Sequence, residues 1–240
     1  IQSKLNIGFE SMVFIDDTKF ERELVRKFLP DVIVPEIPDD PSELLNYFNE
    51  LDIFNGKKTT AEDKARQKFY QEETKRNSLK SRFNNIDEFL NDLKMIANVS
   101  NLSLKTFSRA FQLIQRSNQF NLTTRRHSEK FLHETIKSKN YLPLTISLKD
   151  KLGDNGIVAF LILHLKNERL IIDTWIMSCR VLGRKLEEFT INLIFFHAKK
   201  NGCKIIEGEY IPTNKNKIVK DLFVKFGFKQ LKYKNKQLFE

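Results

Sequence analysis

Three consecutive apolar stretches between residues 142 and 179 constrain the fold of this chain more than any other feature of its sequence. The segment LPLTISLKDKLGDNGIVAFLILHLKNERLIIDTWIMSC is rich in β-branched and other apolar residues and is interrupted twice by turn-forming residues. Residues 153–156 read Gly-Asp-Asn-Gly, and residues 167–168 read Asn-Glu. Apolar runs separated by such turns predict three antiparallel strands.

The residues after these strands predict helices that can cover a sheet. Within residues 181–200, apolar side chains recur at steps of four, three, four and three, which is the period of a helix face: Leu182, Leu186, Phe189, Leu193 and Phe196. Gly202 ends this helix, and residues 203–211 (CKIIEGEYI) read as a further strand. A short helix over 216–226 ends at Gly227, and a final strand closes the chain.

The first 58 residues have a different pattern. Residues 11–15 read as a short buried strand that ends in Asp16 and Asp17, and a helix with an apolar side chain at every fourth position follows. Residues 31–41 (DVIVPEIPDDP) read as a strand interrupted by three prolines. Strand, helix and strand in this order are typical of the end of a parallel α/β sheet.

A charged segment separates the two patterns. Residues 59–83 nearly lack apolar side chains, and Thr60 followed by Glu62 and Asp63 suits the start of a long exposed helix between two domains. Residues 86–97 and 103–116 have helical spacing. We therefore predict an α/β chain with the end of a parallel α/β domain (1–58), a helical linker (59–84) and an α+β domain (85–240, helical to 116) whose sheet is mixed and mainly antiparallel.

The charge of the chain favours an anionic partner. Lys and Arg number 41 against 31 Asp and Glu, a net charge of +10. A phosphorylated metabolite, coenzyme A, an acidic carrier protein or nucleic acid would be attracted, but no nucleic-acid-binding signature is present, so nucleic acid is the least favoured. No apolar segment is long enough to cross a membrane. Two cysteines, Cys179 and Cys203, favour a reducing cytoplasm.

Asp16 and Asp17 are candidate metal ligands. Carboxylates at the carboxyl end of a parallel strand point into the crevice where such sheets bind ligands, and their hard oxygens suit Mg²⁺. The alternative is a solvated turn in which Asp17 or Thr18 caps the next helix. The four histidines have no metal-ligand spacing, so we expect surface or core roles for them.

Residues 177–188 (MSCRVLGRKLEE) form the second candidate site. A strand runs into a helix whose expected first turn holds Arg180, Val181, Gly183 and Arg184, and the free N–H groups of a helix N-terminus favour phosphate groups. The alternative is a helix start with incidental arginines. Cys179 precedes this turn, where the helix and the arginines should lower its thiol pKa. It is therefore a candidate to hold an acyl thioester, and its alternative is a small buried apolar residue.

Two further segments hold candidate site residues. Residues 116–126 (RSNQFNLTTRR) are rich in amides, hydroxyls and arginines that can bind a hydroxylated or phosphorylated substrate. The candidate contacts are Asn118, Gln119, Asn121, Thr123 and Arg125. They can equally form a turn that satisfies its own backbone. Asp154 lies in the expected hairpin turn and is a catalytic candidate facing the cleft.

Several of these blocks together resemble one protein family. The segment FIDDTKFERELVRKFLPDVIVPEIPDDP is similar to motif IV and its sequel in the FkbH-like branch of the haloacid dehalogenase (HAD) phosphatases. The resemblance continues through LTTRR, GDNGIVAFLIL, WIMSCRVLGRKLEE and EGEYIPTNKNKIVKDLF. In that family a HAD domain precedes a GNAT-like acyltransferase domain. The DxDxT nucleophile loop and the later lysine of HAD enzymes are absent before Asp16, so the chain resembles the carboxyl-terminal portion of such an enzyme.

The resemblance implies roles for particular residues. GNAT proteins bind coenzyme A with an R/Q-x-x-G-x-G/A pattern, which Arg180 and Gly183 match, whereas Lys185 replaces its last small residue. This departure counts against ordinary acetyl-CoA binding and leaves a phosphopantetheine arm on a carrier protein, or a small phosphate, as alternatives. The turn after strand 203–211 lies beside the acyl group in GNAT-like folds, which makes Tyr210, Asn214 and Asn216 candidate contacts. Mg²⁺ is implied only together with the preceding HAD half.

Three functions follow as hypotheses. The first is transfer of a glyceryl-type acyl unit from a phosphorylated donor to the thiol of an acyl carrier protein, as in polyketide or polysaccharide pathways. The second is acetyl-CoA-dependent acetylation of an amino sugar, against which Lys185 counts. The third is a non-catalytic binding module.

Overall fold

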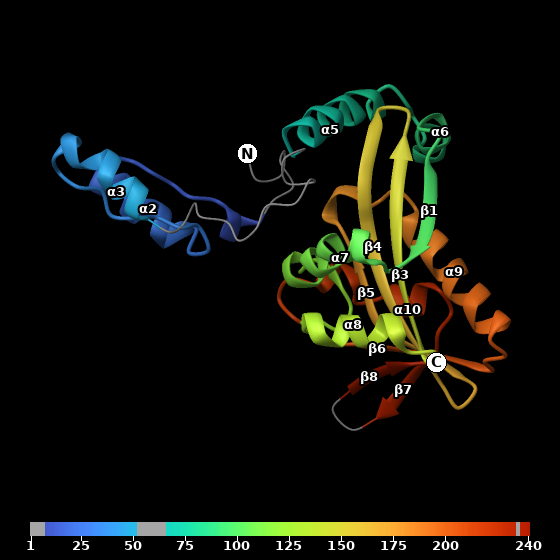
Figure 1. Ribbon diagram of the computed structural model, residues 1–240. Coiled ribbons are helices and arrows are strands. Elements are labelled where there is room, and N and C mark those ends of the chain that lie inside the picture. Colours follow the sequence, from blue (N-terminus) through green and yellow to red (C-terminus); the bar gives the residue numbers. More distant parts are fainter. Residues whose placement is uncertain (1–7, 52–65, 234–235) are drawn as a thin grey trace. The chain divides into compact units, whose positions relative to one another are not determined.

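The three apolar stretches form antiparallel strands, as the sequence predicts: β3 (Tyr141–Asp150), β4 (Gly153–Lys166) and β5 (Arg169–Met177). They lie within one sheet of a computed structural model that describes residues 8–51, 66–233 and 236–240 (Figure 1). The chain divides into two compact units, residues 1–59 and 60–240, and the sheet belongs to the second.

The sheet has the order β1-β3-β4-β5-β6-β8-β7, and β2 pairs with β5 outside this order. The remaining strands are β1 (Ile96–Asn101), β2 (Phe120–Asn121), β6 (Ile205–Tyr210), β7 (Gln230–Tyr233) and β8 (Lys236–Phe239). In this sheet β5 and β6 are parallel and every other pair is antiparallel. The predicted fold class, α/β with a mixed and mainly antiparallel sheet, is confirmed.

Helices cover both faces of the sheet (Figure 1). On one face, α7 (Leu104–Arg116) and α8 (Glu129–Lys137) pack on alternate side chains of the central strands, including Phe160, Ile162 and Ile176. On the other face, α9 (Leu186–Lys200) and α10 (Leu222–Lys225) enclose the larger core, which contains Leu161, Leu163 and Trp175. Because successive side chains of a strand point to opposite faces of the sheet, the same strands contribute to both hydrophobic cores. Among the described residues, no helix has the length and apolar character that a membrane span requires.

The linker helix differs from its prediction. Helix α5 (Arg66–Lys80) is highly charged, but Glu72 and Arg76 are buried rather than exposed. Arg76 donates to both carboxylate oxygens of Asp150, with Nε–Oδ2 at 2.8 Å and Nη2–Oδ1 at 3.0 Å. The Asp150 carboxylate also lies 3.4 Å from Nη1 of Arg184. Nη2 of Arg184 lies 2.6 Å from the carboxylate of Glu73. The charges of α5 thus join it to β3 and to the loop before α9 through buried ion pairs.

Four other expectations need correction. The helix expected over 86–97 ends as α6 (Ile86–Asp92), and residues from Ile96 onward form edge strand β1 because pairing with β3 overrides their helical spacing. The expected turn at 153–156 lies at residues 151–152, where the Asp150 carboxylate accepts the N–H groups of Leu152 and Gly153. The helix expected over 216–226 is a 3₁₀ turn, η4 (Lys217–Val219), followed by α10. The final strand is a hairpin of β7 and β8.

The first unit is described for residues 8–51 only. It contains η1 (Phe9–Ser11), α2 (Lys19–Phe28), η2 (Pro41–Glu43) and α3 (Leu44–Glu50). The two expected strands meet in a single parallel bridge, Val13 with Ile33, instead of forming a sheet. The apolar stripe of α2 is largely exposed in this unit, since Phe20 and Phe28 are 70% and 67% exposed. The assignment of this unit to a HAD domain stays a prediction.

Candidate functional site

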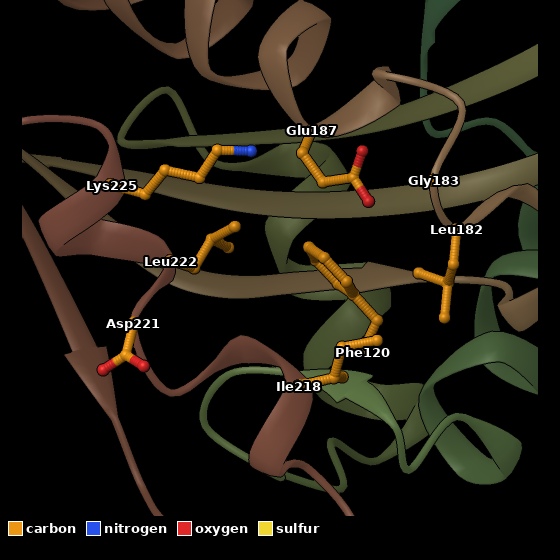
Figure 2. Close-up of a pocket in the computed structure, with 8 residues that line it drawn as sticks. All are labelled: Phe120, Leu182, Gly183, Glu187, Ile218, Asp221, Leu222 and Lys225. Atoms are coloured by element: carbon orange, nitrogen blue, oxygen red, sulfur yellow. The ribbon is translucent and has the colours of Figure 1, made fainter. Parts of the chain in front are cut away.

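The carboxyl ends of the parallel strands β5 and β6 border a pocket (Figure 2). Its volume is about 420 Å³, which lies within the usual range for small-ligand sites of roughly 300–1,000 Å³. The loop after β5, the start of α9 and the segment η4–α10 line it together with one aromatic residue of β2. The lining residues are Phe120, Leu182, Gly183, Glu187, Ile218, Asp221, Leu222 and Lys225. Ligands of parallel strands are expected at this end.

The loop between β5 and α9 sets the shape of this pocket. Residues Cys179–Val181 form a 3₁₀ turn, η3, and Gly183 and Lys185 then take positive φ angles of 73° and 56°. Positive φ cannot continue a right-handed helix, so α9 begins at Leu186 and not at residue 181 as the sequence predicts. A side chain built at Gly183 would meet nothing within 4 Å. The backbone at this glycine is therefore open to the pocket.

Glu187 is an anionic residue that lines the pocket, and sequence analysis missed it. Its side chain points into the pocket (Figure 2), and the N–H groups of Gly183 and of Glu187 itself favour its charged form. Burial raises the pKa of Glu187, while these N–H groups and Lys225 partly offset that effect. An acidic residue in the first turn of a helix was the available signal. The carboxylate occupies the place where the loop can bind an anion.

One cationic and two anionic side chains line the pocket. The N–H groups at Gly183 and the start of α9 supply donors for an anion, and Lys225 reaches in from α10 on the other side (Figure 2). Glu187 and Asp221 also line the pocket and would repel added negative charge.

The residues predicted to bind a cofactor beside Gly183 do not line the pocket. Val181 is fully buried in the core, and its N–H donates to Ser178. Arg184 is 7% exposed and is held by Glu73 and Asp150, and burial lowers its pKa despite these carboxylates. The Nε of Arg180 lies 3.2 Å from the Ser178 hydroxyl. The expected contact of Arg184 with phosphate is corrected, because this side chain is buried among carboxylates, whereas the contact of Arg180 stays a prediction.

Cys179 also differs from its prediction. Its thiol pKa is raised, chiefly by burial, and the nearby charge of Arg180 only partly opposes this effect. The expected lowering assumed that Cys179 stands directly before a helix, but six residues separate it from Leu186, the first residue of α9. A raised pKa means little thiolate at neutral pH. The thioester role is therefore not favoured by the local chemistry.

Asp154 does not face the pocket. It is exposed on β4, pairs with Lys149 at 3.1 Å and accepts the N–H of Gly156 at 2.9 Å. Its position follows from the shifted turn, since residues 153–156 belong to the strand and not to the loop. The expectation that Asp154 contributes catalysis in the cleft is corrected.

Residues 118–125 serve mainly to join the sheet together. Asn121 and Thr123 are 0% and 2% exposed. The amide of Asn121 accepts the N–H of Thr124 at 2.9 Å, and the Thr123 hydroxyl donates to the carbonyl of Asp173 at 3.2 Å. For these two residues the structure supports the alternative, a turn that satisfies its own backbone. Asn118, which contacts Arg126, and Gln119 are half-buried and remain candidate contacts.

The side chain of Asn216 holds the turn after β6 in place through hydrogen bonds. It is fully buried, donates to the carbonyls of Asn121 and Ile211 at 2.9 Å each, and accepts the N–H of Thr213 at 2.7 Å. Tyr210 is 3% exposed and donates to the same amide at 3.4 Å. These two predicted substrate contacts are corrected, because their polar atoms hold the turn after β6. Asn214 is exposed on that turn, and its contact with substrate stays a prediction.

Asp16 and Asp17 form the turn that begins α2. Asp16 accepts the N–H of Thr18 at 2.8 Å, and Thr18 is the N-cap. Arg22 donates to the carbonyls of both aspartates at 2.9 Å. Among the residues the structure describes, no group of three acidic, histidine or cysteine side chains could hold a metal ion. These residues alone do not fit Mg²⁺, and the alternative, a capping turn, describes them.

No family model and no curated protein sequence matches this chain. Solved structures do resemble it over 60% of its length. The ribosomal-protein-S18-alanine N-acetyltransferase from Escherichia coli is 14% identical, with 90% of that chain covered and a TM-score of 0.46. The PaiA N-acetyltransferase from Thermoplasma acidophilum, solved in complex with coenzyme A, is 13% identical, with 97% covered and a TM-score of 0.44. A domain from Methanocaldococcus jannaschii is 17% identical, with 97% covered and a TM-score of 0.48. At these identities the likeness is one of fold.

Proposed function

We propose that residues 85–240 are an acyltransferase domain that passes an acyl unit to the thiol of a phosphopantetheine arm on an acyl carrier protein. The observation that carries this proposal is the pocket at the start of α9, where the N–H of Gly183 favours the charged form of a carboxylate, that of Glu187. A phosphate oxygen has the same charge and the same need for donors as that carboxylate. The domain would hold the arm by its phosphate.

The donor in this proposal is a phosphorylated small molecule, and the transferred group is a glyceryl-type acyl unit. The net charge of +10 supports a carrier protein as partner, since carrier proteins of this class are acidic and opposite charges speed their encounter. The carboxylates of Glu187 and Asp221 in the pocket count against the diphosphate of coenzyme A. The acetyl-CoA-dependent function is therefore the second choice. Any Mg²⁺ would act in a preceding HAD half and not here.

Loading of the carrier tests this function. The chain is incubated with holo-carrier protein and a glyceryl-type acyl phosphate, and the carrier is weighed by mass spectrometry. We expect the mass of one glyceryl unit on the holo-carrier and none on the carrier without its arm. If the carrier keeps its mass while an amino sugar is acetylated from acetyl-CoA in a parallel reaction, the acetyltransferase function would replace acyl transfer to a carrier as the first choice.

A matched pair of variants connects loading to the pocket. Ile218 lines the pocket and is 63% exposed, so Ile218→Trp should fill the pocket at little cost in stability. Val224 is 55% exposed on α10 and does not line it, so Val224→Trp is the control. We expect at least a tenfold slower loading by the first variant and an unchanged rate for the second. Equal rates for both variants would place the arm elsewhere.

A further inference from the structure

The loop before α9 takes a conformation that needs support from outside the loop. Gly183 and Lys185 have positive φ angles of 73° and 56° on either side of Arg184. Glycine adopts such angles freely, but a lysine does so only where its surroundings fix the backbone. Leu182 and Gly183 of this loop also line the pocket. Whatever holds residues 182–185 therefore sets the shape of the pocket as well.

Arg184 is the side chain through which the loop is held. It is 7% exposed, so its guanidinium is withdrawn from water. Nη2 donates to the carboxylate of Glu73 in α5 at 2.6 Å, and Nη1 donates to the carboxylate of Asp150 at 3.4 Å. A buried guanidinium that loses its carboxylates is left as an uncompensated charge. Movement of the loop away from α5 is therefore strongly opposed.

Asp150 is itself fixed, so it is a rigid anchor for Arg184. Its side chain is fully buried and accepts Nε and Nη2 of Arg76 at 2.8 and 3.0 Å. The same carboxylate accepts two backbone N–H groups at the turn between β3 and β4. Glu73 lies 3.4 Å from Nη1 of Arg76, so both carboxylates are shared by the two arginines. Figure 1 shows α5 beside this end of the sheet.

A second contact of the loop is too exposed to replace this one. Lys185 pairs with Asp87 of α6, and the two side chains are 49% and 55% exposed. Exposed ion pairs contribute little to stability, because water and salt screen them. The buried contacts of Arg184 with Glu73 and Asp150 are therefore the ones that hold the loop.

We propose that Glu73 and Asp150 are positioning residues for the pocket at the start of α9, acting through Arg184 on the backbone at Gly183. This inference rests on the proposed binding of a phosphopantetheine arm. Neither carboxylate lines the pocket. They raise the fraction of molecules in which the loop presents its N–H groups, and affinity changes in proportion to that fraction. Helix α5 is thus part of the ligand-binding domain, although it precedes residue 85.

Isothermal titration with phosphopantetheine tests this role in Glu73→Gln, Arg184→Gln and the double variant. Loss of the Glu73 charge by itself would make the region less repulsive to a phosphate, so a purely electrostatic effect gives tighter binding. A loosened loop gives weaker binding. We expect Glu73→Gln to bind about tenfold more weakly, as it would if about a tenth of the molecules kept the loop in place. The double variant should bind within about twofold of Arg184→Gln, because residues that act through one contact are not additive.

The matched control is Glu207→Gln. Glu207 is 27% exposed, close to the 34% of Glu73, and it also pairs with an arginine. That arginine, Arg169, is the first residue of β5, whereas the pocket lies at the other end of this strand. Glu207→Gln should bind phosphopantetheine within about twofold of the wild type.

Relaxation of ¹⁵N nuclei reads the loop without any ligand. Backbone order parameters of residues 182–185 should be near the rigid value of about 0.85 in the wild type and below about 0.6 in Glu73→Gln. The positioning role is overturned if these values do not change, if Glu73→Gln binds as tightly as the wild type, or if the losses of the two single variants add. If Arg184→Gln does not fold, Glu73→Gln decides by itself. If the wild type binds no phosphopantetheine, the proposed function fails, and the order parameters alone decide whether Glu73 holds the loop.

Discussion

Replacing Glu187 with glutamine should make the pocket bind phosphate more tightly. The N–H of Gly183 favours the charged carboxylate of Glu187, so this carboxylate would compete with a phosphate for the same donor. Glutamine keeps nearly the same shape without the charge. A hydrogen bond to a charged group contributes about 1.5–3 kcal/mol and a neutral one about 0.5–1.5 kcal/mol. The difference of about 1.4 kcal/mol corresponds to roughly tenfold tighter binding, and relief of charge repulsion acts in the same direction.

Isothermal titration of the chain with phosphopantetheine measures this effect. The matched control is Glu129→Gln, because Glu129 also lies in the first turn of a helix, α8, but is exposed and does not line the pocket. The control removes the same charge and should bind phosphopantetheine as the wild type does. Equal or weaker binding by Glu187→Gln would refute the idea that this carboxylate occupies the phosphate position.

The pH dependence of the same titration gives an independent check. Burial raises the pKa of Glu187, so the carboxylate becomes protonated at a higher pH than an ordinary glutamate. As pH falls through this pKa, wild-type binding should approach that of Glu187→Gln, because the competing charge disappears. The raised pKa also means that the ionised form destabilises the fold. Stability should therefore fall as pH rises from the unfolded pKa to the folded one, and Glu187→Gln should remove this loss.

Three other substitutions test the roles assigned to buried side chains. Asp150→Asn leaves the guanidinium groups of Arg76 and Arg184 buried with less compensating charge, which should lower the urea-derived free energy of unfolding by about 3–5 kcal/mol; a loss below about 1 kcal/mol would contradict a buried ion cluster. Asn216→Ala removes the hydrogen bonds that hold the turn after β6. It should lower the free energy of unfolding by about 2–4 kcal/mol, because several polar groups lose their partners. Cys179→Ser should load carrier within about twofold of the wild-type rate, and a loss of loading would restore the thioester role.

Periodicity in the sequence was enough to predict the centre of the sheet. Strands β3, β4 and β5 are long apolar runs with turns between them, and α9 has an apolar residue at nearly every helical turn. These signals are local, so they survive whatever surrounds them. Strand β1 was missed because it lies at the sheet edge, with little burial pattern of its own, and is defined by its pairing with β3.

The candidate site was predicted only in part. Gly183 was identified because a glycine between a strand and a helix suggests close approach of a ligand. Arg184 beside it was assigned wrongly, since its partners lie in α5 and β3, and Asp150 lies 34 residues away in the chain. Glu187 was missed because its place in the pocket depends on the conformation of the loop before α9.

The sequence by itself therefore determined which segments pair into a sheet, which helix follows it and where a glycine opens the backbone. These properties depend on the order of apolar and turn residues along the chain. Only the tertiary structure decided which charged side chains face the pocket and which are buried as ion pairs. Each charged group is compatible with either place, and the choice depends on partners far away in the sequence, because a buried charge is stable only where an opposite charge meets it.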